Sequence, residues 1–294
     1  MTQKITPHLW FNREAKDAAL LYTSLFKDSK IISTSTLQNT PSGSVDMVVV
    51  ELSGQRFTLL SAGPFFKFNP SISFLIACNS KEEVDWFWQG LSKQGLVLME
   101  LGSYPFSPWY GWVQDRFGVS WQVMYMGDRR WSQKIIPTLM YVGKQAGKAE
   151  EAIRLYISVF YHAAIGDVLR YERGEEPDIA GTMKHASFQL EDQEFAAMDS
   201  ARDHQFSFNE AISFVVHCTT QKEIDHYWIL SADPKAEQCG WLKDRYGVSW
   251  QIVPTVLEEM LQDKDPVKVA RVTESFLKMK KFDIADLHRA YAGP

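Results

Sequence analysis

The chain contains an internal sequence repeat. Residues 112–123 read WVQDRFGVSWQV and residues 241–252 read WLKDRYGVSWQI, so eight of these twelve positions are identical. The exchange of Phe117 for Tyr246 keeps size and aromatic character. A repeat this close constrains the architecture before any secondary structure is assigned. Residues that both copies share report what the fold requires, so only the differences can report what each copy does.

The repeat covers most of the chain. NPSISFLIACNSKEEVDWFW, starting at Asn69, aligns with NEAISFVVHCTTQKEIDHYW, starting at Asn209. PHLWF at Pro7 aligns with PTLMY at Pro137, and AALLYTSLF aligns with AIRLYISVF. These alignments predict two homologous domains.

The second copy is shorter than the first. The offset between the copies falls from 140 at Asn69 to 129 at Trp112, so the second copy has lost 11 residues. The missing stretch corresponds to part of LVLMELGSYPFSPWY in the first copy. We therefore predict a first domain at 1–130, a second domain at 131–256 that is trimmed by one hairpin region, and a C-terminal helical extension at 257–294.

Composition and charge exclude several classes of protein. A length of 294 residues suits two domains, and the net charge of −5 provides no basic surface for nucleic acid or an anionic membrane. No apolar run approaches the roughly 18 residues of a membrane span, and the N-terminus lacks the apolar core of a signal peptide. Cys78, Cys218 and Cys239 include no C-x-x-C pair, which favours a reducing compartment. We expect a cytoplasmic protein without nucleic-acid or membrane partners.

Hydrophobic periodicity predicts the same order of elements in both halves, namely a strand, a helix and further strands, given twice. The first half begins with a strand at Ile5–Phe11 and a helix at Glu14–Phe26. Further strands follow at Ile31–Leu37, Val45–Leu52, Arg56–Ser61 and Ser71–Cys78, and two or three more end at Trp121–Met126. In the second half a strand at Ile135–Tyr141 is followed by a helix that ends at Phe160, and then by strands at Ile165–Tyr171, Lys184–Leu190, Phe195–Met198 and Ala211–Cys218. Capping boxes at Ser80-x-x-Glu83 and Thr220-x-x-Glu223 predict two further helices. The result is four βαβββ modules, an α+β fold with mostly antiparallel sheet.

Residues after Pro254 have no counterpart in the first copy and carry two apolar stripes at helical spacing. One stripe comprises Val269, Val272, Phe276 and Met279, and the other comprises Ile284, Leu287 and Tyr291. We expect these helices to cover a sheet or a domain seam. The alternative is a homodimer formed through the C-terminal helices or the sheet edges.

Paired βαβββ modules that end in D-x-x-G-x-x-W-Q resemble the vicinal oxygen chelate superfamily of glyoxalases, dioxygenases and bleomycin-resistance proteins. The closer resemblance is to its PhnB-like branch, often labelled 3-demethylubiquinone-9 3-methyltransferase. The motifs that carry it are PHLWF, AALLYTSLF, FKFNPSISF, CGWLKDRYGVSWQIVP and MKKFDIADL. The resemblance implies that two modules close into an eight-stranded cup around a ligand, so we expect two such cups or an equivalent pseudo-symmetric pair.

Enzymes of this superfamily usually hold a divalent metal in the cup through His and Glu ligands. The resemblance places the carboxylate of the closing strand at Gln122 in one copy and Gln251 in the other. A neutral amide brings no charge to offset the dehydration of a cation. The histidine expected near Thr6 is also missing, and the second copy has Ile136 there. We therefore expect no cofactor and no catalytic metal.

Three histidines keep a metal-dependent alternative open. His8 shares a strand face with Thr6, although the second copy has Thr138 in its place. His185 and His217 could lie on strands of the second copy, and the first copy has no equivalents. A divalent metal bound by such residues would favour a lyase, isomerase or dioxygenase.

The shared D-x-x-G-x-x-W-Q motif has a structural interpretation. Asp115 and Gly118 suit a tight hairpin, because Asp caps its own turn and Gly tolerates a positive φ. Trp121 and its counterpart Trp250 alternate with valines on one strand face, which predicts core packing. The opposite face carries the pairs Ser120 with Gln122 and Ser249 with Gln251. If that face lines a cup, these four polar residues are candidates to bind a ligand.

An aromatic cluster occupies the segment that the second copy lacks. It consists of Tyr104, Phe106, Trp109, Tyr110 and Trp112. One interpretation is hairpin packing. The other is a wall over the first cup, in which Trp109 and Tyr110 stack against a flat or cationic ligand.

No sequence motif identifies an enzymatic reaction. A methyltransferase that uses S-adenosylmethionine commonly needs a Gly-rich loop between a strand and a helix, and no segment has that spacing. No G-x-S-x-G elbow is present either. The leading hypothesis is a small-molecule-binding protein without metal chemistry. The alternatives are the metal-dependent enzyme, a methyltransferase as the branch label suggests, and a dimerising structural module.

Overall fold

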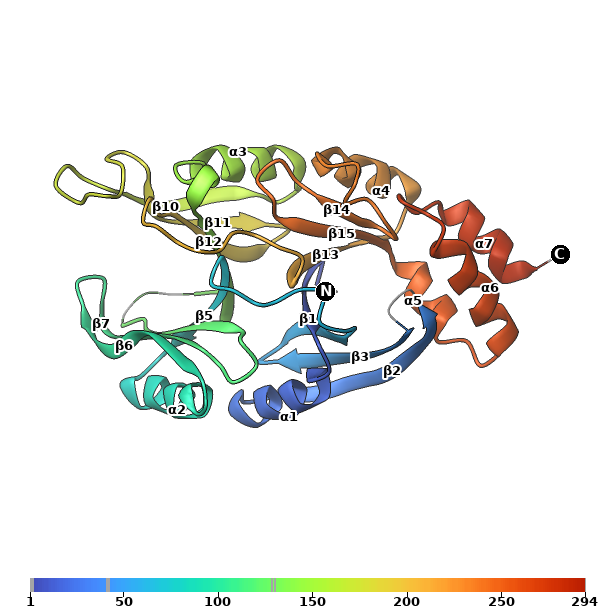
Figure 1. The fold of residues 1–294 in the computed structure, drawn as a ribbon, viewed down its shortest axis with the longest axis horizontal. Helices are drawn as coiled ribbons and strands as arrows, with labels where there is room; N and C mark the ends of the chain where they lie inside the picture. The colour runs from blue at the N-terminus through green and yellow to red at the C-terminus, as the bar shows by residue number, and fades with distance from the viewer. Residues whose placement is uncertain (1–2, 41–42, 128, 130, 294) are drawn as a thin grey trace. The chain divides into compact units, whose positions relative to one another are not determined.

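The structure is a computed structural model and describes residues 3–40, 43–127, 129 and 131–293. Within these residues the fold is built on two mixed β-sheets, one of seven and one of eight strands (Figure 1). The chain divides into two compact units, residues 9–212 and residues 1–8 together with 213–294. Arg130, the last residue of the predicted first domain, lies outside the described residues.

The first repeat forms two consecutive βαβββ modules, as its sequence pattern predicts. The first module consists of β1 (Ile5–Phe11), α1 (Ala15–Leu25), β2 (Lys30–Thr40), β3 (Gly43–Leu52) and β4 (Gln55–Ser61). The second module consists of β5 (Ile72–Cys78), α2 (Lys81–Ser92), β6 (Leu96–Tyr104), β7 (Ser107–Gln114) and β8 (Ser120–Tyr125).

The second repeat follows the same order, and its last module is reduced. The third module consists of β9 (Ile135–Tyr141), the 3₁₀ turn η1 (Gly143–Gln145), α3 (Ala149–Val159), β10 (Ala164–Arg170), β11 (Met183–Leu190) and β12 (Gln193–Asp199). The fourth consists of β13 (Ile212–Cys218), α4 (Gln221–Tyr227), the 3₁₀ turn η2 (Trp228–Leu230), β14 (Trp241–Lys243) and β15 (Ser249–Pro254). Among the described residues this module lacks a counterpart of β6, which explains the 11 residues missing from the second copy.

Each sheet combines one module from each repeat. The eight-stranded sheet has the order β10-β11-β12-β9-β5-β8-β7-β6, and the seven-stranded sheet has the order β14-β15-β13-β1-β4-β3-β2. In the larger sheet β9 pairs antiparallel with β5, from Ile72 opposite Leu139 to Ile76 opposite Ile135. The two modules of one repeat therefore lie in different sheets, which is the pseudo-symmetric arrangement rather than one cup per repeat.

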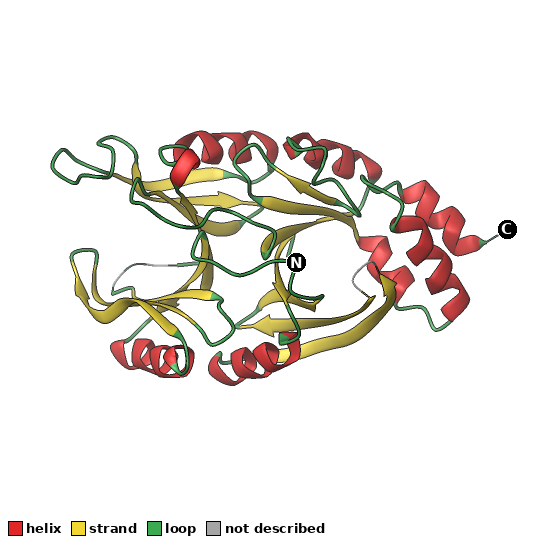
Figure 2. Ribbon diagram, viewed as in Figure 1, coloured by secondary structure: helices red, strands yellow, loops and turns green. Residues whose placement is uncertain are grey.

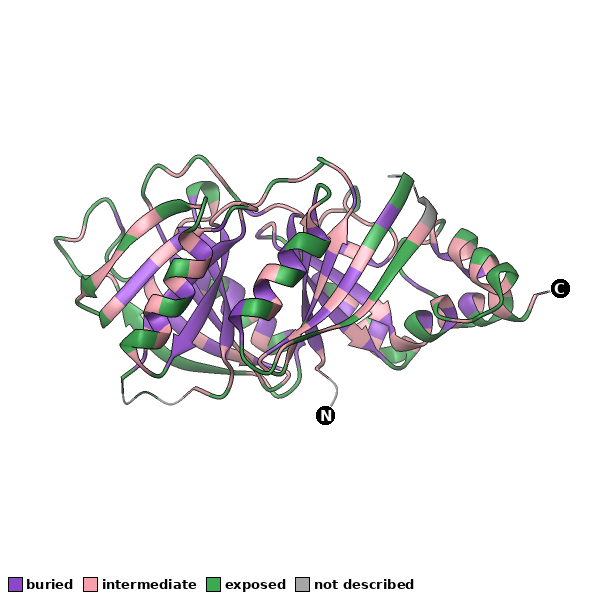
Figure 3. Ribbon diagram, turned by 90° about the horizontal axis from the view of Figure 1, so that it is seen from below, coloured by how far each residue is buried: buried purple, intermediate pink, exposed green. Residues whose placement is uncertain are grey.

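The two faces of the eight-stranded sheet differ in what covers them. Helices α2 and α3 lie over one face, where α2 contacts β7 and β8 and α3 contacts β11 (Figure 2). That face holds a compact aromatic core, in which the rings of Phe74 and Trp121 lie 5.4 Å apart. The central strands β5, β8 and β9 are buried, whereas the edge strand β10 and the outer sides of the helices are exposed (Figure 3). We call the opposite face of this sheet, which carries the alternate residues of the same strands, its inner face.

The shared motif fixes a buried turn in both repeats. Asp115 accepts hydrogen bonds from the Trp121 indole at 2.9 Å and from the backbone amides of Phe117 and Val119. The Tyr22 hydroxyl also donates to this carboxylate at 2.7 Å. In the second repeat the equivalent Asp244 accepts hydrogen bonds from the Trp250 indole and from the backbone amides of Tyr246 and Val248. The predicted structural interpretation of the motif is confirmed, because one carboxylate satisfies the turn and anchors the core tryptophan.

The C-terminal extension forms the helices α5 (Thr255–Leu261), α6 (Pro266–Phe276) and α7 (Ile284–Ala292). Of the predicted stripes, Val272, Phe276 and Leu287 are buried. The segment between α6 and α7 packs against the turn before β14, since the amide of Cys239 donates to the Met279 carbonyl at 2.8 Å. The extension is therefore part of the packed unit that contains β13–β15.

Among the described residues, every helix is too short or too polar to span a lipid bilayer.

Candidate functional site

The inner face of the eight-stranded sheet positions Gln122 through two hydrogen bonds. The Tyr110 hydroxyl donates to its amide oxygen at 2.8 Å, and its amide nitrogen donates to the Ser73 hydroxyl at 2.8 Å. Gln122 lies on β8, Tyr110 on β7 and Ser73 on β5, and all three are buried. A primary amide has four hydrogen-bonding positions, so these two bonds fix its orientation without exhausting its capacity.

Apolar side chains surround this amide. The cluster of buried residues consists of Leu75, Ala77, Tyr110, Met124, Met126, Ile136 and Ala196. The partly buried side chains of Met99, Tyr104, Trp112 and Trp131 pack against it. In addition, the Trp112 indole donates to the Ser120 hydroxyl at 2.8 Å. A few polar groups within an apolar and aromatic lining is the composition typical of small-molecule sites.

The corresponding strands of the seven-stranded sheet repeat the amide–hydroxyl pair. The Gln251 amide nitrogen donates to the Ser213 hydroxyl at 2.9 Å, as Gln122 does to Ser73. Gln251 lies on β15 and Ser213 on β13, on the strand face opposite to Trp250. We call this the inner face of β13–β15 and of the neighbouring part of β1, residues Ile5–His8.

His8 extends this polar set. Its Nδ1 atom lies 3.5 Å from the Ser213 hydroxyl, and its ring is 5% exposed. Burial lowers the pKa of His8 to about 4, because the charged imidazolium would lose its hydration. The imidazole is therefore neutral at neutral pH. On the same two strands, the hydroxyl of Thr6 on β1 and the Nε2 atom of His217 on β13 are 3.0 Å apart.

The two inner faces differ at the shared serine. The sequence repeat pairs Ser249 with Ser120, and Trp241 with Trp112. Trp112 binds Ser120, whereas the Ser249 hydroxyl is buried and has no hydrogen-bond partner among the described residues. Trp241 instead packs edge-on against the His8 ring, with ring centroids 5.5 Å apart.

The predicted aromatic wall is divided between the two faces of the hairpin. Tyr110 is on the inner face and lies 5.5 Å from the Tyr104 ring. Trp109 is on the helix side, where its indole donates to Asp85 of α2 at 2.7 Å and Lys81 lies over its ring. The alternative interpretation, in which Trp109 and Tyr110 line the same wall, does not fit these contacts, because consecutive strand residues point to opposite faces. The contacts are those of a packed hairpin.

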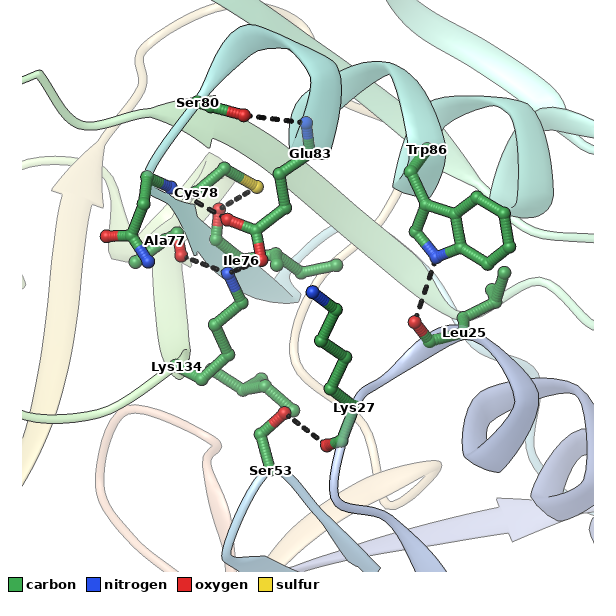
Figure 4. A network of polar contacts seen from close by, with 12 residues as sticks. Leu25, Lys27, Ser53, Ile76, Ala77, Cys78, Ser80, Glu83, Trp86 and Lys134 are labelled. Carbon is green, nitrogen blue, oxygen red and sulfur yellow. Dashed lines mark hydrogen bonds and ion pairs between the residues drawn. The ribbon is translucent and has the colours of Figure 1, made fainter.

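A groove of about 690 Å³ lies outside the inner faces. It runs between the C-terminal end of α1 and the N-terminal half of α2, and Figure 4 shows its polar contacts. Lys134 pairs there with Glu83 at 2.7 Å and also donates to the Ala77 carbonyl (Figure 4). Lys4 and Glu223, the repeat counterparts, form the same 2.7 Å pair. Because both repeats keep it, we interpret this ion pair as a requirement of the fold.

The Lys4–Glu223 pair also shows how the fold stabilises the ionised carboxylate of Glu223. Burial alone would raise the pKa of Glu223, yet hydrogen bonds from Lys4 and Thr219 together lower it to about 2. Sequence reasoning missed this pair, although the alignment contains its signal. The lysine before the first strand and the glutamate of the capping box are both shared by the repeats.

A family model described as 3-demethylubiquinone-9 3-methyltransferase matches the chain twice, at residues 3–124 and 133–253. The chain belongs to this family. The predicted tandem form is thereby confirmed, since both repeats match separately. A search of curated proteins gave no match.

The chain is similar to two solved structures. A putative 3-demethylubiquinone-9 3-methyltransferase, PhnB protein, from Bacillus cereus is 38% identical over 42% of this chain and 99% of its own, with a TM-score of 0.39. Glyoxalase I from Zea mays is 12% identical over 88% of this chain and 97% of its own, with a TM-score of 0.55. The latter likeness shows that the two sheets have the vicinal oxygen chelate fold.

The metal site that this fold implies does not fit the residues present. The resemblance assigns the position of the metal-binding carboxylate to Gln122 and Gln251, and each of these amides is bonded to a serine. His8 and His217 belong to the seven-stranded sheet, and His185 belongs to the eight-stranded sheet. In the described part of the chain, no three His, Cys, Asp or Glu side chains are grouped as a metal site requires.

Proposed function

We propose that this protein binds a small organic molecule on the inner faces of its sheets without using a catalytic metal. The observation that supports the proposal best is the repeated amide–hydroxyl pair, Gln122 with Ser73 and Gln251 with Ser213. Each pair presents donors and acceptors of fixed orientation inside an otherwise apolar surface. Such an arrangement recognises polar groups of a ligand by hydrogen bonding.

The likeness to glyoxalase I from Zea mays supports the same proposal at the level of the fold. The finer choice, binding without metal chemistry, is supported by the donor set. Hydroxyls and neutral amides bring no net charge to a divalent cation, whereas they pair well with carbonyl, amide and hydroxyl groups. The metal-dependent lyase, isomerase or dioxygenase remains the alternative, because His8 is buried on an inner face.

The test begins with native mass spectrometry of the full chain purified without chelators. We expect no stoichiometric divalent metal, with or without a retained organic ligand. A thermal-shift screen of metabolites would then find stabilising compounds. A stoichiometric metal would contradict the proposal and favour the alternative.

Two glutamine variants and one control connect binding to the inner faces. Gln122→Ala or Gln251→Ala should weaken a compound found in the screen by about five-fold or more, the value of one net hydrogen bond. The control is Gln114→Ala, because Gln114 bonds only the Gly118 carbonyl of its own turn among the described contacts. Binding that is equally strong in all three variants would place the ligand elsewhere.

A further inference from the structure

The buried hydroxyl of Ser249 is a hydrogen-bonding group that the fold leaves unused. Its oxygen is shielded from solvent, and among the described residues it has no hydrogen-bond partner. Buried polar groups are nearly always paired, because an unpaired one keeps its full desolvation cost. The turn that precedes Ser249 does not require this group, since Asp244 satisfies the amides of Tyr246 and Val248.

In the eight-stranded sheet the equivalent serine hydroxyl has a hydrogen-bond partner within the protein. There Ser120 accepts the Trp112 indole at 2.8 Å. The equivalent Trp241 packs instead against His8, and the repeat counterpart of His8 is Thr138. His8 and the Ser249 hydroxyl, which has no partner among the described residues, thus occur together in the seven-stranded sheet. Thr138 and the bonded Ser120 occur together in the eight-stranded sheet.

The groups around Ser249 are mostly uncharged hydrogen-bonding groups. Ser213 is its register partner on β13, and Gln251 follows two residues later on the same face. The neutral His8 ring completes the set through Ser213. Lys243 is the register partner of Ser249 on β14, but it is only partly buried and already has an interaction partner.

We infer that the inner face around Ser249 binds a small uncharged ligand whose carbonyl oxygen accepts the Ser249 hydroxyl. The Ser213 and Gln251 side chains then orient the ligand, and the Trp241 ring, held by His8, forms an aromatic side of the site. This inference rests on the proposed function, and it adds both the location of the site and the chemical class of the ligand. The eight-stranded sheet would not bind this group in the same way, because Ser120 is already bonded.

The probes for the test are trifluoroacetamide and trifluoroacetate, which are nearly identical in size and differ in charge. Each is titrated with the full-length protein, and its binding is followed by the broadening of its ¹⁹F resonance. Ser249→Ala removes the proposed donor. Gln114→Ala is the control, since Gln114 bonds only the Gly118 carbonyl of its own turn among the described contacts.

We expect trifluoroacetamide to bind the unmodified protein and the Gln114→Ala variant equally. Its affinity should fall about five-fold or more in Ser249→Ala, as expected for one lost hydrogen bond. Trifluoroacetate should bind at least ten-fold more weakly than the amide. An amide that does not bind, or that binds Ser249→Ala unchanged, would overturn the inference, and so would preferential binding of the anion.

Failure of this inference can be separated from failure of the proposed function. A metabolite from the thermal-shift screen that depends on Gln122 or Gln251, but not on Ser249, would refute the site proposed here and leave the binding function standing. If no compound from the screen binds and trifluoroacetamide does not bind either, both proposals fail. A ¹⁵N-correlated spectrum of each variant confirms that it is folded.

Discussion

The difference between the two shared serines predicts opposite effects of the same substitution on stability. Ser120→Ala leaves the Trp112 indole without its acceptor and should lower the free energy of unfolding by about 1–3 kcal/mol. Ser249→Ala removes a hydroxyl that has no partner among the described residues, so the free energy of unfolding should stay within about 0.5 kcal/mol or rise. Urea denaturation of both variants measures the difference. Equal losses would mean that Ser249 is satisfied in solution, for example by water.

His8 should make stability depend on pH in a specific window. Its pKa is about 4 in the folded protein and 6.5 when unperturbed, so the unfolded chain binds the extra proton between these values. Stability is therefore fully present above pH 6.5 and is lost as the pH falls toward 4, by about 3 kcal/mol for this group alone.

The control for this pH dependence is His8→Thr, which introduces the residue found at the repeat position, Thr138. Carboxylates such as Glu223 titrate in both proteins, so only the difference between them reports on His8. Urea denaturation at pH 7 and pH 4.5 should show a smaller loss in the variant. The same loss in both proteins would contradict a buried, neutral His8.

Strand alternation predicted the faces of individual residues wherever the strand is regular. Gln122 and Gln251 were assigned correctly to the face opposite the core tryptophans. Trp109 was misassigned because it was grouped with Tyr110 by composition, although adjacent strand residues diverge. The free hydroxyl of Ser249 could not be predicted, because it depends on how Trp241 packs against His8, a residue on a strand far away in the sequence.

At the scale of elements, the turn before β14 predicts an unusual sensitivity at Gly240. This glycine has φ +82°, and a Cβ atom there would lie 2.4 Å from the Phe282 ring, between α6 and α7. Gly54 is a matched control, since its φ is +81° and nothing lies within 4 Å of its Cβ position. Gly54→Ala should cost about 1 kcal/mol from backbone strain alone.

Gly240→Ala should cost about 1–3 kcal/mol more than Gly54→Ala, because the methyl group also meets the Phe282 ring at 2.4 Å and the Ile252 carbonyl oxygen at 2.9 Å. Thermal or urea denaturation of the two variants measures this difference. Equal costs would show that the segment between α6 and α7 is not packed against the turn.

The elements themselves were largely predictable, because hydrophobic periodicity and capping signals are local. Both predicted capping boxes begin a helix, but only that of Thr220 and Glu223 is complete. At Ser80 the hydroxyl accepts the Glu83 amide, while the Glu83 carboxylate binds Asn79 and Lys134 instead. The local signal located the helix start but did not determine whether the carboxylate would complete the box, since Glu223 completes it while forming the equivalent ion pair with Lys4.

At the scale of the whole molecule, the exchange of modules predicts that one repeat cannot complete a sheet alone. Its modules lie in different sheets, each beside a module of the other repeat. A fragment of residues 1–130 should therefore associate as a dimer, in which each copy replaces the missing repeat. Size-exclusion chromatography with light scattering would show this mass, and a folded monomer would contradict it. The predicted domain boundary at 130/131 stays a prediction until this fragment is tested.

The sequence could not distinguish this exchange from one cup per repeat. The repeat makes β5 and β13 near-equivalents, and likewise β1 and β9. Pairing β1 with β5 or with β13 would thus bring together nearly the same side chains. Residue patterns determine the faces and the elements, but they do not determine the choice between equivalent partners.

The position of β1 beside β13 also has a consequence for biosynthesis. His8 and Ser213 are neighbours across these strands and 205 residues apart in sequence. At a translation rate of roughly 5–20 residues per second, the N-terminal strand waits on the order of 10–40 s for that partner. During this time one edge of β1 is open to the wrong repeat or to another nascent chain. The ribosome thus imposes a delay in which mispairing competes with the native sheet.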